Sequence, residues 1–257
     1  GAKSKLLVKK KKTLPLNGNK EISFDKVEII SRRSIKKVSI KKINHLPSQI
    51  KKYVKYDIQL IKRKKKFINL SLKNTPIIMG ILNITPDSFS DGGRFNKIDK
   101  AKKQLKQLFK SGADLVDIGG ESTRPGSKAI NIKTEWNRLK NILKIIDKRK
   151  IISLDTRKSE IMEKGINFGV KLINDVSGLN YDKNSINILK KYNVPFVLQH
   201  SLGNPDVMQN DPKYKNILLD IYDFFEDKIK YLRKVGISHN NIILDPGIGF
   251  GKNLKHN

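Results

Sequence analysis

From about residue 76 onward, short apolar runs alternate with longer amphipathic stretches, and this alternation constrains the fold more than any other feature of the sequence. Short apolar runs bounded by turn residues are typical of buried strands, while apolar residues recurring every three or four positions indicate helices. Strands that alternate with helices form βα units around a parallel sheet. The predicted strands are 77–82, 115–118, 151–154, 171–173, 195–198 and 241–244, and the predicted helices lie near 97–111, 133–148, 158–167, 185–191 and 215–235.

Polar residues follow every predicted strand. A (β/α)8 barrel gathers its active site at the carboxyl ends of its strands, whereas a doubly wound sheet binds ligands only at its switch point. The pattern therefore favours a (β/α)8 TIM barrel in the α/β class. Taken singly, Asp155 also fits an N-cap of the next helix, and His200 also fits a hydrogen-bonded core residue. The polar groups are Asn83, Glu121 to Arg124, Asp155, Asn174 with Asp175, Gln199 with His200, and Asp245.

Residues 1–75 differ from the rest in charge and contain no motif with recognisable chemistry. They hold 23 basic and 4 acidic side chains, against 31 and 20 in residues 76–257. β-like runs at 27–30, 38–40 and 56–60 alternate with lysine-rich spacers, so we expect a partly ordered appendage or linker of unknown role. The chain thus divides into a basic N-terminal extension, 1–75, and a barrel domain, 76–257.

A net charge of +30 raises nucleic acid as a possible partner. The basic clusters almost lack aromatic residues for stacking on bases, since 9–12 has none and 62–66 is followed only by Phe67. We therefore assign the charge to solvated faces and expect no nucleic-acid partner. The absence of cysteine excludes a disulfide framework and a thiolate metal site, and the apolar runs are too short for a membrane span. We expect a soluble, cytoplasmic protein.

Five segments carry a resemblance to a known family. They are 83–93 (NITPDSFSDGG), 117–126 (DIGGESTRPG), 153–156 (SLDT), 173–175 (IND) and 245–252 (DPGIGFGK). In this order they resemble dihydropteroate synthase, the folate-pathway enzyme that sulfonamides target. The resemblance covers about residues 76–257 and implies a transferase. That enzyme joins 6-hydroxymethyl-7,8-dihydropterin diphosphate to p-aminobenzoate, releasing pyrophosphate and forming 7,8-dihydropteroate.

The resemblance implies that Asp155, Asn174 and Asp245 bind the pterin. The carboxylate of Asp245 can accept two neighbouring N–H groups of the pterin, and the amide of Asn174 can donate and accept beside it. Loss of pyrophosphate leaves positive charge on the dihydropterin. Asp155 is the residue we expect to stabilise this charge, and therefore to act catalytically.

The resemblance also implies a cofactor and two closing loops. Asn83 would coordinate Mg²⁺, which neutralises the diphosphate. Thr123 and Arg124 would contact phosphate and aminobenzoate during catalysis, and Phe89 and Pro125 would flank the aminobenzoate ring. Closure of the loops excludes water from the reacting centre. From the resemblance we also expect the full-length enzyme to be a homodimer.

Three features depart from the family pattern. Gln199 stands where relatives usually have Met packed on the pterin, and shorter members lack the first 75 residues. The sequence also stops at Asn257, after the sixth predicted strand, before the segments that supply further pterin and phosphate contacts in the family. We therefore expect a fragment of a longer reading frame, truncated after about strand six, that is inactive and poorly stable as it stands.

Two other functions remain open at this point. A pterin-binding methyltransferase shares the barrel and an Asp–Asn–Asp pocket but acts on methyltetrahydrofolate with a corrinoid. Its first loop differs, and the long 83–93 and 121–126 segments match the synthase. A basic, non-catalytic nucleic-acid-binding protein on an old barrel is the second alternative, and it would not retain carboxylates at the strand ends.

Overall fold

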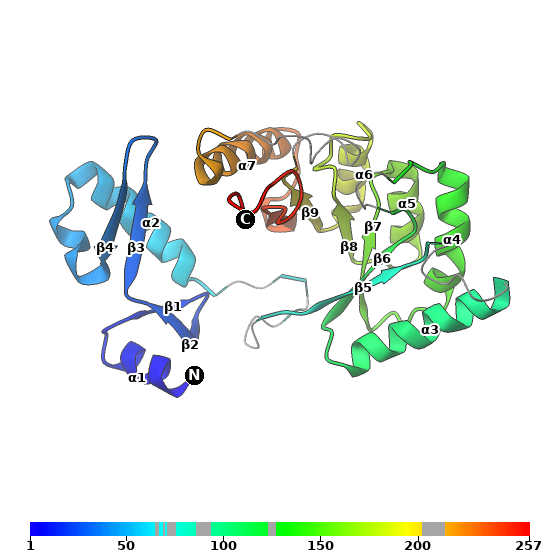
Figure 1. Cartoon of the computed structure of the whole chain (residues 1–257), viewed down its shortest axis with the longest axis horizontal. Helices are drawn as coiled ribbons and strands as arrows, with labels where there is room; N and C mark the ends of the chain where they lie inside the picture. Colours follow the sequence, from blue (N-terminus) through cyan, green and yellow to red (C-terminus); the bar gives the residue numbers. More distant parts are fainter. Residues whose placement is uncertain (65–66, 69, 71–75, 86–93, 123–126, 202–213) are drawn as a thin grey trace. The chain divides into compact units, whose positions relative to one another are not determined.

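The computed structural model of the chain describes residues 1–64, 67, 68, 70, 76–85, 94–122, 127–201 and 214–257. These residues fall into two compact units, Gly1–Ile77 and Ile78–Asn257 (Figure 1). Each unit has a hydrophobic core of its own.

A parallel six-stranded sheet forms the centre of the second unit. Its strands are adjacent in space in the same order as in the chain. A doubly wound sheet reverses its order at a switch point, whereas a barrel adds each strand beside the last. The strand order is therefore that of a (β/α)8 barrel, as predicted. The strands are β5 (Met79–Asn83), β6 (Leu115–Gly119), β7 (Ile151–Asp155), β8 (Leu172–Asp175), β9 (Phe196–Gln199) and β10 (Ile242–Asp245).

The polar residues at the strand ends belong to the strands themselves. The sequence predicted that the strands stop at their last apolar residues, but β7 ends at Asp155 and β10 at Asp245. Asn83, Asn174 and Gln199 likewise lie within β5, β8 and β9. A polar side chain does not prevent its backbone from pairing with the next strand, so the ladder continues past the apolar run. These side chains therefore have directions set by the sheet.

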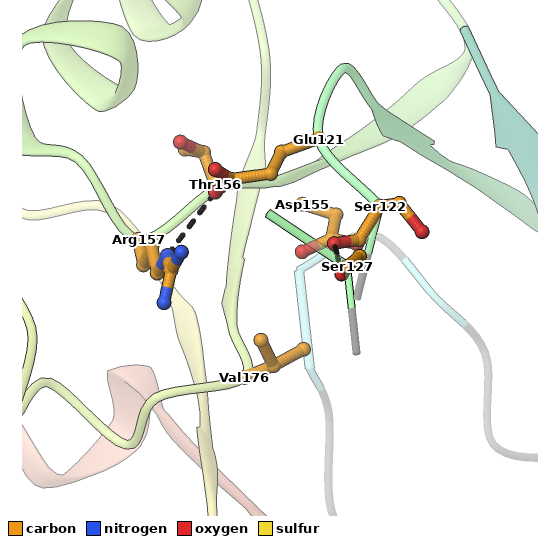
Figure 2. A pocket seen from close by; sticks show the side chains of 7 residues that line it. All are labelled: Glu121, Ser122, Ser127, Asp155, Thr156, Arg157 and Val176. Atoms are coloured by element: carbon orange, nitrogen blue, oxygen red, sulfur yellow. Dashed lines mark hydrogen bonds and ion pairs between the residues drawn. The ribbon is translucent and has the colours of Figure 1, made fainter. Parts of the chain in front are cut away.

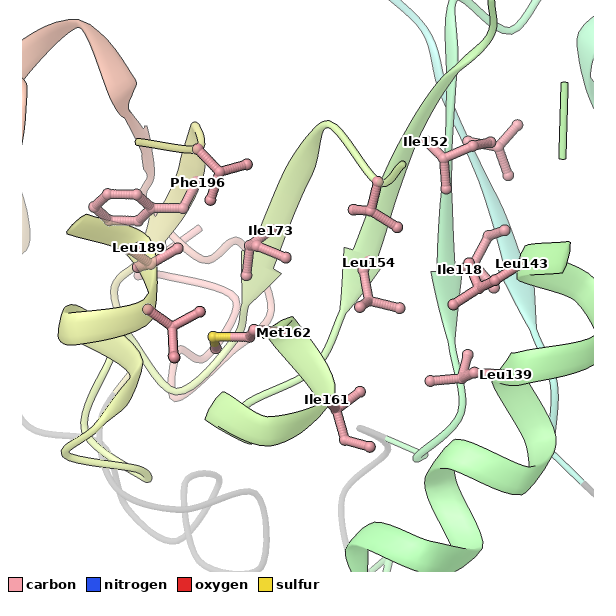
Figure 3. Close-up of a cluster of buried hydrophobic side chains, with 14 of the residues drawn as sticks. Ile118, Leu139, Leu143, Ile152, Leu154, Ile161, Met162, Ile173, Leu189 and Phe196 are labelled. Atoms are coloured by element: carbon pink, nitrogen blue, oxygen red, sulfur yellow. The ribbon is translucent and has the colours of Figure 1, made fainter. Parts of the chain in front are cut away.

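Helices α3 to α6 lie along one face of the sheet and bury its apolar side (Figures 1 and 3). Ile118 and Leu154 from strands, and Leu139 and Ile161 from helices, are fully buried there. Each such side chain stabilises the fold by roughly 1.5–3 kcal/mol. No helix in the described ranges is long and apolar enough to cross a lipid bilayer. The helices are α3 (Arg94–Lys110), α4 (Ile132–Lys144), α5 (Ser159–Asn167), α6 (Ser185–Tyr192), α7 (Ile217–Lys234) and the short 3-10 helix η3 (His239–Asn241).

The opposite face of the sheet is polar at its carboxyl edge. Successive strand residues point to opposite faces, so Ile152 and Leu154 on the apolar side of β7 place Asp155 on the other side. The same alternation along the neighbouring strands sends further polar side chains to that face. They are Asn83, Asp117, Asn174, Gln199 and Asp245.

The first unit forms a compact unit with a small core, which is more order than the partly ordered appendage or linker that we expected. Val38, Ile43 and Ile58 are buried in its small core. The predicted strand at 56–60 is wrong, because this stretch lies within a helix; Val54 and Ile58 follow the four-residue spacing of a buried helical face. The elements are α1 (Ala2–Lys9), the antiparallel pairs β1 (Leu14–Leu16) with β2 (Asn19–Phe24) and β3 (Lys26–Ile30) with β4 (Ile35–Ser39), the 3-10 helix η1 (Ile40–His45) and α2 (Ser48–Lys62).

Candidate functional site

Four residues form a row across the carboxyl ends of β5 to β8, which we call the strand-end row. Asn83, Gly119, Asp155 and Asn174 are register partners from each strand to the next. Gly119 keeps the row compact, because a Cβ at this position would lie 3.2 Å from Asn83 Oδ1 and 3.2 Å from Asp155 Oδ2. The row thus brings together three residues to which the sequence analysis gave metal or pterin contacts.

Asp117 fixes the orientation of Asn174. Its Oδ2 accepts a hydrogen bond from Asn174 Nδ2 at 2.8 Å, and its side chain is buried. Burial raises the pKa of Asp117, and the nearby hydroxyl of Ser153 and the hydrogen bond from Asn174 oppose the rise. With Nδ2 engaged, Asn174 retains a buried Oδ1 that has no hydrogen-bond partner among the described residues. Asn174 therefore offers an acceptor atom to a ligand.

Negative charge accumulates around Asp155. Burial raises the pKa of this carboxyl well above its ordinary value, and neighbouring carboxylates raise it further. Those neighbours are Asp117, Glu135, Asp175 and Glu121. The alternative role of Asp155 as an N-cap is wrong, because α5 begins at Ser159, whose N–H donates to Asp182 Oδ2 at 2.8 Å. Asp155 is therefore a carboxyl group in a site that favours a positive partner.

Asp245 ends β10 beside Gln199, its register partner on β9. Asp245 Oδ1 accepts a hydrogen bond from the Gly247 N–H at 2.7 Å. The turn requires glycine at that position, because φ is +68° and a Cβ would collide with the backbone carbonyl of His200. A carboxylate has about four acceptor positions, so Asp245 can hold this turn and still bind a ligand.

Lys252 and His200 close the glycine-rich turn. Lys252 Nζ lies 3.1 Å from His200 Nδ1 and donates to the carbonyl oxygens of Gly247 and Phe250 at 3.1 and 3.0 Å. Burial, reinforced by the charge of Lys252, lowers the pKa of His200 to about 4. The ring also packs edge-on against Phe224, with 4.9 Å between centroids. His200 is therefore a packed, hydrogen-bonded residue and stays neutral near pH 7.

A second group of buried polar residues, which we call the ion-pair cluster, consists of Glu121, Glu135, Thr156 and Lys158. Lys158 Nζ donates to Glu121 Oε2 at 3.0 Å and to Glu135 Oε2 at 2.6 Å. Thr156 Oγ1 donates to Glu135 Oε1 at 2.6 Å, and the Ile130 N–H donates to Glu121 Oε1 at 2.8 Å. Every carboxylate oxygen of the cluster thus has a partner.

Asp155 and two members of the ion-pair cluster, Glu121 and Thr156, line the same small pocket (Figure 2). Arg157 reaches its wall, where Nε donates to Glu121 Oε2 at 3.1 Å and the guanidinium lies 4.1 Å from the centroid of the Tyr181 ring. One cation, Arg157, and two carboxylates, Glu121 and Asp155, therefore border the same space. The lining residues are Glu121, Ser122, Ser127, Asp155, Thr156, Arg157 and Val176.

Four of the predicted site residues lie outside the described part of the chain. They are Phe89, Thr123, Arg124 and Pro125. The residues flanking 123–126 are tied together, since Ser127 Oγ donates to the Ser122 carbonyl oxygen at 2.6 Å. The contacts proposed for the four residues remain predictions.

Sequence reasoning missed the supporting roles of Asp117, Glu135 and Lys158. Asp117 carried a usable signal, because a carboxylate inside an otherwise apolar strand and two positions before Gly119 must share the face of the row. Glu135 and Lys158 are 23 residues apart and come from a helix and a loop. No local pattern links them.

Residues 79–257 match the family described as pterin binding enzyme. A dihydropteroate synthase from Clostridium beijerinckii is 45% identical over 182 residues, which cover 70% of this chain and 65% of that protein. The dihydropteroate synthase of Escherichia coli K12 is 39% identical over 184 residues, with 71% and 65% coverage. The chain therefore spans about 65% of the length of these relatives.

The second unit also resembles solved structures. A Yersinia pestis dihydropteroate synthase in complex with a sulfonamide drug has a TM-score of 0.68 and 39% identity, covering 75% of this chain and 71% of that one. The family match covers more than half of this chain, and the sequence identities support it over the same region. The chain belongs to the pterin-binding enzyme family.

Proposed function

We propose that the protein containing this chain is a dihydropteroate synthase, which joins 6-hydroxymethyl-7,8-dihydropterin diphosphate to p-aminobenzoate and forms 7,8-dihydropteroate. The observation that carries the proposal is the strand-end row, with Asp245 on the same face and Asp117 holding Asn174. The relatives named above are dihydropteroate synthases, which favours this reaction over methyl transfer. In the proposal the partners are small molecules, and no nucleic acid takes part.

The proposed pterin contacts follow from the donors and acceptors of these side chains. A pterin edge carries an amino group beside a ring N–H, and a carboxylate such as Asp245 can accept from both. Asn174 Oδ1 can accept a further N–H, because Nδ2 is already bound to Asp117. Together these two residues would orient the ring so that its reactive exocyclic carbon reaches Asp155.

The electrostatics around Asp155 suit a reaction that forms positive charge. The same buried carboxylates that raise its pKa lower the energy of a cation placed beside it. Positive charge spreads into the dihydropterin ring as the bond to pyrophosphate breaks. Asp155 would therefore stabilise the transition state more than the bound substrate.

The residues present fit a magnesium ion held partly by substrate. Among the described residues no group of three His, Cys, Asp or Glu side chains could hold a metal alone. Mg²⁺ prefers oxygen ligands and often binds through one or two side chains together with substrate phosphates. Asn83 Oδ1 would hold it, across Gly119 from Asp155 Oδ2. The ion would supply neutralisation of the diphosphate.

The remaining parts of the proposal concern the loops and the assembly. Thr123 and Arg124 would bind phosphate and aminobenzoate, while Phe89 and Pro125 would flank the aminobenzoate ring. A Clostridium difficile dihydropteroate synthase, 40% identical with a TM-score of 0.64, was solved in the presence of pteroic acid, which makes that compound a suitable probe. We also propose sulfonamide inhibition, a homodimer and a cytoplasmic location.

Calorimetry with pteroic acid tests the pterin site without requiring turnover. We expect binding that Asp245→Asn weakens by about 2–3 kcal/mol, because the variant replaces a charged acceptor with a group that also donates. Asp147→Asn is the matched control, since Asp147 pairs with Arg149 on the surface. Binding of methyltetrahydrofolate in preference to pteroic acid would favour the methyltransferase. Incorporation of labelled p-aminobenzoate then tests the reaction itself.

A further inference from the structure

Gln199 lies on the same face of the sheet as the proposed pterin ligands. Phe196 and Leu198 of β9 are buried in the core against the helices, so Gln199 points to the opposite face. Its register partner on β10 is Asp245, and Val197, two residues earlier, is the partner of Asn174. Gln199 therefore stands between the strands that carry Asn174 and Asp245.

The side-chain amide of Gln199 is buried but not satisfied. The residue is 3% exposed, and Nε2 has no hydrogen-bond partner among the described residues. A buried donor without a partner costs free energy, and nearly all such groups in folded proteins are paired. An apolar residue would fill this position without that cost. The amide is therefore better explained by a partner that arrives with a ligand than by packing.

The neighbouring groups in the site are hydrogen-bond acceptors, so the acceptor atoms of a ligand still need a donor. The carboxylates Asp155 and Asp245 only accept hydrogen bonds when ionised, and the free atom of Asn174 is also an acceptor. A pterin has acceptor atoms as well as N–H groups, namely a carbonyl oxygen and unprotonated ring nitrogens. Among the described residues, Gln199 Nε2 is an unpaired amide donor on this face that matches them.

We propose that Gln199 determines pterin specificity by donating from Nε2 to an acceptor atom of the pterin ring. This inference rests on the proposed function, because it assumes that the site binds a pterin. It adds a polar contact beyond those of Asp155, Asn174 and Asp245. The contact strengthens binding of a ring that has an acceptor atom at that place, and a ring without one leaves the buried donor unpaired and binds more weakly.

The experiment compares Gln199→Met with Gln107→Met in calorimetric titrations with pteroic acid. Methionine has a similar length and no donor. Gln107 serves as the control because its Nε2 donates to Ser111 Oγ at an exposed site away from the proposed pocket. We expect Gln199→Met to weaken binding about 3- to 10-fold, the effect of one neutral hydrogen bond, and Gln107→Met to leave it unchanged. Thermal unfolding of both variants separates loss of a contact from loss of the fold.

A second variant and a spectrum cover the case in which Gln199→Met unfolds. Gln199→Glu keeps the length and an acceptor but loses the amide donor, so it should weaken binding at least as much. In the ¹H–¹⁵N spectrum of the unchanged protein, a side-chain amide signal that is missing from the Glu variant should shift when pteroic acid is added. Normal binding by a folded variant, or an amide signal that does not move, would overturn the inference alone. Failure of the unchanged chain to bind pteroic acid would overturn the proposed function and this inference with it.

Discussion

The ion-pair cluster is buried and the strand-end row is partly exposed, and the two polar groups also differ in how completely their atoms are paired. In the cluster, each oxygen of Glu121 and Glu135 accepts a hydrogen bond. In the row, Asn174 Oδ1 has no partner among the described residues, and Asp155 is surrounded by other carboxylates. The difference indicates that the cluster stabilises the fold, whereas the row is built to bind.

The pKa shifts in the two regions have opposite directions because only the ion-pair cluster compensates for burial. Burial raises the pKa of Glu121, but hydrogen bonds from the Ile130 N–H, Lys158 and Arg157 outweigh it and lower the pKa overall. Asp155 is partly buried without such compensation, and its pKa rises. A charge that the protein has already neutralised cannot stabilise a ligand strongly, so the uncompensated carboxylate is the one suited to chemistry.

The largest effect should follow from removing the cation of the cluster. Lys158→Met leaves Glu121 and Glu135 buried without their shared partner, and we expect a loss of about 3–5 kcal/mol in the free energy of unfolding. The matched control is Lys230→Met, because Lys230 forms an exposed pair with Glu226 whose loss should cost less than about 0.5 kcal/mol. Urea unfolding measures both. Equal effects in the two variants would show that the cluster does not stabilise the fold as a unit.

Asp155→Asn should have the opposite effect, lowering activity without lowering stability. The folded state holds the Asp155 proton to higher pH than the unfolded state, so ionisation near pH 7 opposes folding and its removal should not lower stability. We expect the rate of dihydropteroate formation to fall about 10²- to 10³-fold, the usual effect of removing one transition-state contact, with a smaller loss in pterin affinity. Equal losses in rate and affinity would contradict the role assigned to Asp155.

The sequence predicted the fold of the second unit well because buried parallel strands leave a clear apolar signal. The predicted strands ended one or two residues before the observed ones. The last residue of a strand such as Asp155 or Asp245 is polar, but its backbone still pairs with the neighbouring strand. The prediction failed at 56–60, where Tyr56 and Leu60 belong to α2. In a short amphipathic segment, apolar residues can fit a strand and a helix equally, and packing decides between them.

The site was predictable only where position along a strand was enough. Asn83 and Asp155 each end a strand and Asn174 is the last residue but one of β8, and parallel strands in barrel order bring such residues to one edge. The pairing of Asn174 with Asp117 spans 57 residues and depends on which side chains share a face and a row. Local sequence does not show which distant side chains become hydrogen-bond partners in the folded sheet. The residues that orient each site residue are therefore visible only in the structure.

Asp175 provides a test of how a buried carboxylate makes the stability of the fold depend on pH. Burial raises the pKa of Asp175 from 3.8 to about 6, despite its hydrogen bonds from Ser177. The unfolded chain loses this proton at lower pH than the folded chain, so stability should fall as pH rises from about 4 to 6, by at most roughly 3 kcal/mol. Asp175→Asn does not ionise and keeps Oδ1 for the Ser177 bonds. The difference in unfolding free energy between the two proteins should therefore grow in favour of the variant over this range, whereas parallel curves would contradict the assignment.

The smallest expected effect comes from a single methyl group inside the strand-end row. Gly119→Ala places a Cβ 3.2 Å from Asn83 Oδ1 and 3.2 Å from Asp155 Oδ2, so both side chains must move by a few tenths of an ångström. Gly80→Ala is a close control, because its Cβ would meet Leu108 Cδ2 at 3.1 Å on the helix-covered face. We expect both variants to lose a similar stability, about 1 kcal/mol. Only Gly119→Ala should also weaken pteroic acid binding, by roughly 3- to 10-fold, because ligand contacts depend on the spacing of the row. If the two variants bind pteroic acid equally well, the compactness of the row serves packing alone, and the contrast between a structural cluster and a binding row no longer holds.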